Sequence, residues 1–427
     1  MKNIVRKRML KKPIGYRFYV ALLGLSLGFT AWAEQVQTPK TISLVEAVKL
    51  NLDHHPDLRA FAPQQRMWEG RIQQAGVGER PQIGFMVEDA LGTGDHSGFK
   101  SMQSTLTFSW LLQQEQVASR VNAAKSEATN LVLEKQIKAL DLSALVTKLY
   151  VEILVKQERL KLNLLAKKQA QEVVKTIAKR VQVGKSLSVE EQLAKAELLR
   201  TELAVEDLEH ELKASRYKLA ALWGQPASNY SLNGDLLDIP ATPDVDKQLA
   251  LLKQNPRLQQ FASAQRIAQS QMELARIEAK SQWQFTAGVR RYETTDDYGV
   301  VAGITIPWGD SNRNAGTIAA LQAQQEVLDS ERAALMQQLD TQLYVLLQEM
   351  NHSQHVIKTM NQAVIPTLDQ ALREAENAFN RGQFSYNQFN TVRQELLNAQ
   401  GQLLDAFASL HFQHIEIQRL TGSSISQ

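Results

Sequence analysis

The chain has 427 residues, 48 basic and 45 acidic side chains, and no cysteine. The absence of cysteine excludes a disulfide scaffold, thiolate metal sites, a catalytic thiol and a lipid-modified N-terminal cysteine. Seven basic residues and no acidic residue fall within 1–33, which leaves 41 basic and 45 acidic residues in the remainder. This slightly acidic balance lacks the basic footprint of a nucleic-acid-binding protein.

Residues 1–33 have the layout of a secretory signal peptide. A basic start precedes an apolar run at 18–31, and Ala31 and Ala33 place small residues where a signal peptidase cleaves. The apolar run is short for a membrane-crossing helix, so a membrane anchor is the weaker alternative. We expect cleavage before Glu34 and export of the mature chain.

Two halves of the mature chain match at a constant offset. Trp110 corresponds to Trp308 and Gly184 to Gly382, each pair being 198 residues apart. A fixed offset held over most of each half predicts two copies of one structural unit. We place the copies at 34–224 and 248–422, with a linker at 225–247 and a C-terminal tail at 423–427.

Most of each copy has the periodicity of long helices. The segment 111–183 contains neither glycine nor proline, and its apolar residues recur at steps of three and four. Helices of this length without a globular core are typical of coiled-coil hairpins. Pro366 should kink or break one of them. The expected helices are 113–182, 187–223, 315–381 and 384–421.

Four short segments alternate between apolar and polar residues instead. They are 82–88, 102–110, 282–290 and 298–306. Each has about the nine residues that a tilted strand needs to cross a bilayer. An apolar face toward lipid and a polar face toward a wet lumen would explain the alternation. A small soluble sheet that caps a helical bundle is the alternative.

Four strands are too few to close a barrel, because the smallest membrane barrels have about eight. An open sheet edge in lipid would leave backbone groups unpaired. The chain must therefore assemble with copies of itself, giving eight strands from two chains or twelve from three. The polar lumen faces favour the wider, water-filled option.

The order of helix, strand hairpin, very long helix, turn and return helix, present twice, resembles the TolC-type outer-membrane efflux family. The resemblance covers essentially all of the mature chain. Short stretches also resemble the outer-membrane component of cobalt–zinc–cadmium efflux systems, namely 51–58, 288–291, 304–307 and 312–316. One departure is that 108–117 lacks the Gly-Lys pair that relatives often place after this strand, which leaves the local barrel-to-helix turn undefined.

The resemblance implies a mainly α-helical fold with a small β part. Three chains would form a 12-stranded β-barrel in the outer membrane of a Gram-negative bacterium, continued by a helical barrel through the periplasm. The partners would be a periplasmic adaptor and a proton-driven inner-membrane pump. The chain would be a passive duct with no cofactor and no enzymatic activity.

The expected cargo is divalent heavy-metal cations. A multidrug or organic-solute duct and a type I secretion duct of the same fold remain open. Rivals from other classes are a periplasmic coiled-coil adaptor and a soluble coiled-coil scaffold. We find no Gly-rich phosphate loop, HExxH or Gly-x-Ser-x-Gly motif that would indicate an enzyme.

The two helix turns are the candidate adaptor-docking tips. Glycine at each turn supplies the positive φ that a reversal needs. Ser188 has Glu191 three residues later, which is the spacing of a capping box. The tip residues are Val183, Gly184, Lys185, Ser186 and Leu187 in the first copy, and Arg381, Gly382, Gln383, Phe384 and Ser385 in the second.

Relatives can carry acidic residues just beyond the second tip glycine, where they form a constriction. Gln388 and Thr391 occupy those positions here. The corresponding position of the first copy is Glu190, which makes these three residues the aperture candidates. Ordinary helix-dipole preference also explains a glutamate in a first helical turn.

Two histidine pairs fall at similar heights on the second helical hairpin. His352 and His355 precede Gly382, and His411 and His414 follow it at comparable distances. Each pair has i,i+3 spacing, and neutral imidazole is a common zinc ligand. A tethered metal site is therefore one reading, although solvated or packed histidines are the preferred one. We also expect His54 and His55, before Pro56, to cap a helix.

Overall fold

The computed structural model describes residues 41–226, 229–309 and 312–423. The predicted signal peptide at 1–33 lies outside these residues, as does all of the predicted tail except Ser423. The described part is mainly helical with a small β part, which confirms the fold class expected from the sequence.

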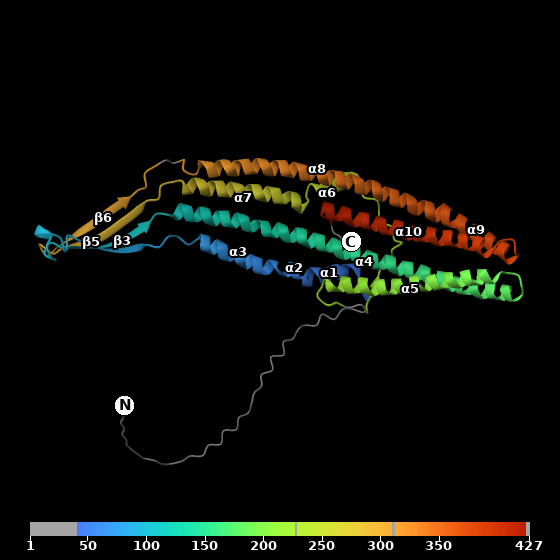
Figure 1. Ribbon diagram of the computed structural model, residues 1–427. Coiled ribbons are helices and arrows are strands. Elements are labelled where there is room, and N and C mark those ends of the chain that lie inside the picture. The colour runs from blue at the N-terminus through green and yellow to red at the C-terminus, as the bar shows by residue number, and fades with distance from the viewer. Residues whose placement is uncertain (1–40, 227–228, 310–311, 424–427) are drawn as a thin grey trace, which may run out of the picture. The chain divides into compact units, whose positions relative to one another are not determined.

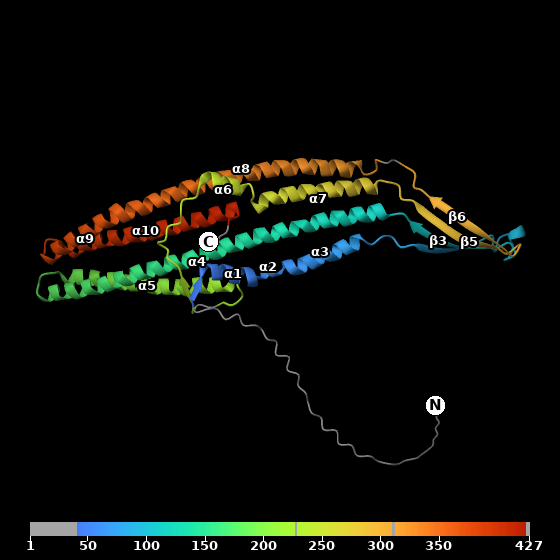
Figure 2. The same ribbon diagram turned by 180° about the vertical axis from the view of Figure 1, so that it is seen from behind.

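The described part of the first half begins with a short strand and three helices and continues into a strand hairpin and a helical hairpin (Figures 1 and 2). Its helices are α1 (Leu44–His54), α2 (Pro56–Arg59), α3 (Phe61–Ala75), α4 (Gln114–Gln182) and α5 (Ser188–Ala221). Its strands are β1 (Thr41–Ser43), β2 (Gln82–Glu88) and β3 (Gln103–Leu111), and β4 (Ser231–Asn233) follows in the expected linker.

The second half follows the same order. Its strands are β5 (Gln284–Tyr292) and β6 (Asp297–Thr305). Its helices are α6 (Val245–Leu252), α7 (Pro256–Glu278), α8 (Ala315–Thr359), α9 (Ile365–Asn380) and α10 (Tyr386–Thr421).

The long helices lie side by side and bury one continuous apolar cluster. Helix α4 contacts α5, α7 and α10, and α8 contacts α7 and α10. The cluster includes the fully buried Ile153, Leu219, Leu343 and Leu410, which come from four different helices. Burial of such apolar stripes is the main source of stability for helices of this kind.

A charged network also ties three helices together. The Asp141 carboxylate on α4 accepts hydrogen bonds from Arg257 on α7 (2.8 Å) and Arg419 on α10 (3.0 Å). Arg419 also pairs with Glu416, and Lys148 donates to the Glu416 carboxylate at 2.8 Å. These contacts link the two halves of the chain, because α4 belongs to the first half and α7 and α10 to the second.

The four long strands form one antiparallel sheet in the order β2-β3-β5-β6. Strand β3 pairs with β5 along nine residues, from Gln103 opposite Tyr292 to Leu111 opposite Gln284. This pairing joins the hairpins of the two halves into a single sheet.

The predicted strand at 82–88 is confirmed, but the other three bounds were shifted. The structure has 103–111 instead of 102–110, 284–292 instead of 282–290, and 297–305 instead of 298–306. The pairing of β5 with β6 runs past the predicted ends toward the loop, where Tyr292 lies opposite Asp297. Strand length is therefore set by pairing, which the local pattern does not encode.

A second, two-stranded sheet was missed by the sequence analysis. Strands β1 and β4 pair in parallel, from Thr41 opposite Ser231 to Ser43 opposite Asn233. The Tyr150 hydroxyl of α4 lies within hydrogen-bond distance of the Ile42 and Asn233 carbonyl oxygens, at 3.0 and 2.6 Å. Burial raises the pKa of Tyr150 to about 12, so the hydroxyl remains a donor.

The helix does not break at Pro366, although a break was one of the two outcomes expected from the sequence. A π-helical turn at Met360–Val364 lies between α8 and α9, and Pro366 is the second residue of α9. The Ile365 N–H reaches back to the Met360 carbonyl oxygen. The wider turn continues the helix up to a residue that has no N–H to donate.

Gln113 organises the turn between β3 and α4. Its side-chain amide bonds both backbone groups of Glu79, accepting from the N–H and donating to the carbonyl oxygen, each at 2.8 Å. A Cβ added to Gly78 would lie 2.6 Å from the Gln113 amide nitrogen. These two hydrogen bonds define the turn between β3 and α4.

We predict that Gly288→Ala destabilises the sheet. The new Cβ would lie 2.4 Å from the Leu106 carbonyl oxygen, and overpacking of this kind costs about 1–3 kcal/mol. Gly303→Ala is the matched control, because its nearest neighbour, the Thr286 Cβ, is 3.9 Å away. The measurement is the melting temperature in detergent. Equal melting temperatures for the two variants would contradict the prediction.

Candidate functional site

One face of the four-stranded sheet is apolar and uncovered in the described chain. Ile83 is 77% exposed and Val300 is 86% exposed, although both lie within strands. Trp110 and Phe285 stack with their ring centroids 5.6 Å apart. The apolar residues of this face include Ile83, Phe85, Val87, Leu106, Phe108, Trp110, Phe285, Ala287, Val289, Val300, Ala302 and Ile304, and Ser104 and Arg291 lie on the same face at its end near the loops.

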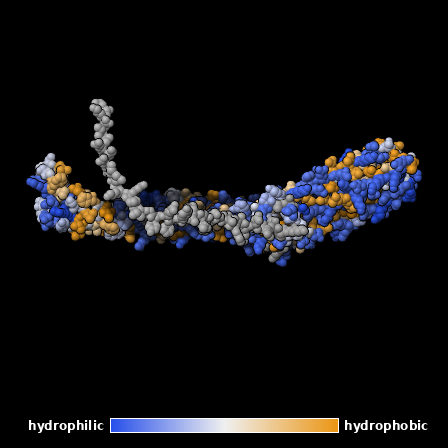
Figure 3. Space-filling view, turned by 90° about the horizontal axis from the view of Figure 1, so that it is seen from below, coloured by the Kyte–Doolittle hydropathy of each residue, from blue (hydrophilic) through white to orange (hydrophobic). Residues whose placement is uncertain are grey.

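Figure 3 shows apolar side chains gathered at the sheet end beside a polar extremity. The polar extremity corresponds to the loops that follow β2 and β5. A contiguous exposed apolar face of this kind marks a surface that contacts lipid or another protein.

The opposite face of the sheet is polar and internally bonded. Arg290 donates to Glu88 (2.8 Å), Gln103 (3.0 Å) and Thr105 (2.9 Å), and so joins β5 to both strands of the first hairpin. All three guanidinium nitrogens are hydrogen-bonded, and the Glu88 carboxylate balances the charge of Arg290. Arg290 lies in the 288–291 stretch that carried the subfamily resemblance, but its partners were not foreseen.

Strands β2 and β6 are the outer strands of the described sheet. Each therefore has one edge without a ladder partner among the described residues. Unpaired strand edges are templates for pairing with another chain, and a membrane-spanning sheet cannot leave them open in lipid.

Both helical hairpins reverse through a glycine with positive φ, as expected. The φ angle is 73° at Gly184 and 81° at Gly382. The Lys185 N–H bonds the Arg180 carbonyl at 2.8 Å, and the Gln383 N–H bonds the Ala378 carbonyl at 2.9 Å. These bonds have the spacing of a Schellman turn, which only a left-handed residue permits at low cost.

The two tips are held together by a small apolar cluster and by Arg180, which the sequence analysis did not single out. Ile177, Ala375, Phe379, Tyr386 and Phe389 are buried in this cluster. The Arg180 guanidinium donates to the Phe379 carbonyl at 2.6 Å and lies 4.4 Å from the centre of its ring. A cation is thereby placed at the C-terminal end of α9, where the helix dipole favours it.

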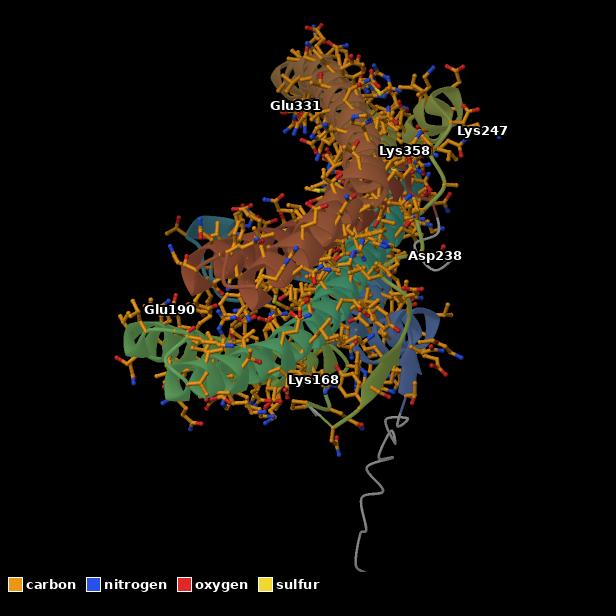
Figure 4. The ribbon with its side chains drawn as sticks, turned by 90° about the vertical axis from the view of Figure 1, so that its right-hand side faces the viewer. Lys168, Glu190, Asp238, Lys247, Glu331 and Lys358 are labelled. Atoms are coloured by element: carbon orange, nitrogen blue, oxygen red, sulfur yellow. The ribbon has the colours of Figure 1, made fainter. Side chains whose placement is uncertain are left out.

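Glu190 makes the complementary contact at the other end of the turn. Its carboxylate accepts a hydrogen bond from the Tyr386 N–H at 3.2 Å, in the first turn of α10. Figure 4 shows Glu190 at the end of the first hairpin on the side of the second. The aperture candidate of the first copy is therefore bonded to the neighbouring tip within the same chain.

The other two aperture candidates are exposed and bonded locally. The Gln388 side chain accepts from the Ser385 N–H at 2.9 Å and forms a capping box with Ser385. Thr391 donates to the Asn387 carbonyl at 3.0 Å.

The capping box predicted at Ser188 was wrong, because Leu187 occupies the N-cap of α5 and no side chain caps that helix end.

The candidate docking residues form a continuous surface around the two turns. Val183 and Leu187 are 67% and 69% exposed, while Phe384 is half-buried against the tip cluster. A shallow groove between the tips is lined by Gly184, Lys185, Ser186, Leu187, Gly382, Gln383, Phe384 and Ser385, together with Arg180 and Glu190. Exposed apolar side chains beside a polar groove are features of a protein-binding surface.

The four histidines of the candidate metal cluster are engaged differently from one another. His352 and His355 are exposed, whereas His411 Nε2 donates to the Leu236 carbonyl oxygen at 2.8 Å. His414 is half-buried, and burial followed by the charge of His411 lowers its pKa. Among the described residues, no group of three or more His, Asp or Glu side chains is arranged to hold a metal ion.

His55 caps a helix as expected, since its Nδ1 accepts from the Asp57 N–H at 3.2 Å. His54 instead ends α1, with its Nδ1 at 3.0 Å from the Leu50 carbonyl oxygen.

None of the helices in 41–226, 229–309 and 312–423 combines the length and apolarity needed to cross a membrane.

The profile of the family described as "Outer membrane efflux protein" matches residues 47–225. Together with the fold described above, this match indicates an outer-membrane efflux protein. The chain is an outer-membrane efflux channel with a long periplasmic helical part, and it is not an enzyme. Proteins of this family form trimeric channels that work with an adaptor and an inner-membrane pump.

Among characterised proteins, the chain is 24% identical over 387 residues to the cobalt-zinc-cadmium resistance protein CzcC of Cupriavidus metallidurans. The match covers 89% of this chain and 90% of that protein. The fold matches CusC with a TM-score of 0.71 at 15% identity, covering 89% of this chain and 92% of CusC. It matches the outer membrane protein VceC of Vibrio cholerae with a TM-score of 0.70 at 18% identity, covering 90% and 96% of the two chains.

We predict that Arg180→Met loosens the contact between the tips. The variant keeps an apolar stem but loses a charged hydrogen bond, which is worth about 1.5–3 kcal/mol. Backbone amides of 379–386 should then exchange about tenfold faster in hydrogen-exchange mass spectrometry. Arg381→Met is the control, because the exposed Arg381 side chain bonds the Asn377 carbonyl of its own helix and no other described residue. Identical exchange in both variants would refute the role of Arg180.

We also predict that acidification destabilises the region around His414. A histidine with a lowered pKa in the folded state binds fewer protons than in the unfolded chain, so its stabilising effect is lost as pH falls below about 6.5. The melting temperature should fall less between pH 7.5 and pH 5 in His414→Leu than in the unaltered protein. Exposed His210→Leu is the control. A pH dependence that His414→Leu leaves unchanged would contradict the prediction.

Proposed function

We propose that three copies of this chain close a 12-stranded barrel in the outer membrane and export divalent heavy-metal cations through it. The single observation that carries the duct is the sheet, with one exposed apolar face, one polar face and two outer strands without partners. Lipid would cover the apolar face, and the polar face would line a wet passage. Strand β6 of one copy would pair with β2 of the next.

The cargo is proposed from relatedness. The similarity to CzcC, a protein named for cobalt, zinc and cadmium resistance, spans nearly nine-tenths of both chains. Arg290 is paired to Glu88 on the polar face, so it offers no free cation that would repel a passing metal ion. Because a duct need not bind what it conducts, organic solutes, drugs and secreted proteins are the alternative cargoes.

The tips are proposed as the surface that docks the periplasmic adaptor, which a separate proton-driven pump would load. Val183, Leu187 and Phe384 would supply apolar contacts, and Lys185, Arg381 and Gln383 polar ones around them. Glu190, Gln388 and Thr391 are proposed to border the periplasmic aperture. In this assignment the Glu190 contact with Tyr386 holds the two tips together until a partner engages them.

The proposed duct also rests on a duplicated chain. Residues 34–224 and 248–422 would be two copies of one unit, each giving one strand hairpin to the barrel wall and one helical hairpin to the tunnel. The linker at 225–247 would join them. Three chains would then supply twelve strands and six helical hairpins.

We predict that deleting the gene makes its bacterium sensitive to zinc, cobalt and cadmium salts. The minimum inhibitory concentrations of these metals should fall several-fold, while those of antibiotics and detergents stay within twofold. Complementation with the unaltered gene is the control and should restore tolerance. Sensitivity to drugs with normal metal tolerance would replace the proposed cargo without changing the duct.

A further inference from the structure

The two halves of the chain connect the sheet to their long helix in different ways. In the first half, β3 ends at Leu111 and α4 begins at Gln114, and Gln113 organises the turn between them. In the second half, β6 ends at Thr305, whereas α8 begins only at Ala315. The second half therefore has a longer connection at the junction of β6 with α8 (Figure 1).

This connection carries Trp308, which is 99% exposed, so its indole ring makes almost no contact with the rest of the chain. In the sequence it continues the row of apolar residues that alternates along β6. Trp110 and Trp283 lie at the same end of the sheet, with ring centroids 5.6 and 6.4 Å from that of Phe285. Tryptophan is enriched at the boundary between acyl chains and headgroups, because its ring is apolar and its N–H needs a polar partner.

The direction of the helices determines which leaflet this connection faces. The helical part of the chain extends into the periplasm, so the end of the sheet that joins the helices lies at the periplasmic leaflet of the outer membrane. That leaflet consists of glycerophospholipids, whose phosphates lie just outside the acyl chains. An exposed tryptophan at this end of the sheet is therefore surrounded by lipid headgroups.

A cleft of about 530 Å³ opens beside Trp308, within the usual size range of small-molecule sites. Its lining includes two basic side chains, Lys280 and Arg313, and one acidic side chain, Glu278. Lys280 is paired with Glu115 at 2.5 Å. The exposed Arg313 guanidinium has no hydrogen-bond or ion-pair partner among the described residues. Arg313 is thus available to a phosphate group, whose oxygens a planar guanidinium can bind in pairs.

Two hydrogen bonds hold the connection near its ends. The Ser281 hydroxyl donates at 2.7 Å to the carbonyl oxygen of Pro307, the residue before the exposed tryptophan. The side-chain amide of Asn314, the residue after the unpaired arginine, donates at 2.7 Å to the Ala275 carbonyl oxygen. The backbone beside both side chains is therefore positioned before a ligand binds, which lowers the entropic cost of binding.

We propose that this cleft binds the headgroup of an anionic glycerophospholipid from the periplasmic leaflet. Arg313 pairs with the lipid phosphate, and the Trp308 ring packs against the acyl chains next to it. A lipid held here fixes the height of the sheet in the membrane, at the point where the sheet continues into the helices. The site rests on the proposed function only in that the sheet lies in the membrane, and it does not depend on the cargo.

The experiment counts lipids bound to the purified protein in detergent by native mass spectrometry. The titrants are phosphatidylglycerol, phosphatidylcholine with the same acyl chains, and glycerol phosphate, which has no acyl chains. The variants are Arg313→Gln and Trp308→Ala, both at exposed positions where little packing is lost. Arg276→Gln is the matched control, because Arg276 is an exposed arginine of α7 that lies outside the cleft.

We expect one phosphatidylglycerol per chain in the unaltered protein and in Arg276→Gln. Because a basic side chain near an anionic headgroup strengthens binding about fivefold, Arg313→Gln should raise the Kd by about that factor. Trp308→Ala should raise it similarly, and phosphatidylcholine, which has no net charge, should bind several-fold more weakly. Equal affinities in Arg313→Gln and Arg276→Gln would overturn the proposal. Glycerol phosphate binding as tightly as phosphatidylglycerol would overturn it too, since the site would then recognise a free anion.

The same spectra test the proposed barrel separately, through the mass of the assembly. A trimer in which Arg313→Gln leaves lipid binding unchanged removes the lipid site and leaves the barrel standing. A monomer that binds one phosphatidylglycerol, and binds it more weakly as Arg313→Gln, supports the site and contradicts the barrel.

Discussion

The antiparallel pairing of β3 with β5 is the constraint on which the rest of the structure depends. It joins strand hairpins that lie about 180 residues apart into one sheet, and it fixes which side chains share a face. A slip of one residue would turn Leu106, Phe108 and Trp110 to the polar side. The close approach of Gly288 to the Leu106 carbonyl shows how tightly this register is specified.

Much of the fold could be predicted from the sequence because its elements are long and strongly periodic. A stretch without glycine or proline predicted α4 to within one residue. The features that were missed depend on contacts distant in sequence. Strands β1 and β4 have three residues each and are defined only by one another and by Tyr150. Likewise, the π turn before Pro366 has no local signature that separates it from a simple kink.

The candidate site was predictable in part for the same reason. Gly184 and Gly382 located both turns, because a reversal needs a residue that tolerates positive φ. The partners of the charged residues were not predictable. Glu190 resembled an ordinary first-turn acid, and Arg180 an ordinary last-turn base, yet both reach across to the second hairpin. Each forms a hydrogen bond with a backbone group at a helix end of the second hairpin. Glu190 accepts from the Tyr386 N–H, and Arg180 donates to the Phe379 carbonyl oxygen.

The parallel pairing of β1 with β4 has a consequence for the order of assembly. Secreted chains emerge on the far side of the inner membrane from the N-terminus onward, so Thr41 arrives well before Ser231, its partner 190 residues later. Until then β1 has no strand to pair with, and the Tyr150 hydroxyl lacks one of its two acceptors, the Asn233 carbonyl oxygen. Closing so long a loop is slow. The two-stranded sheet therefore forms late, because β4 is exported only after the whole first helical hairpin has crossed the inner membrane.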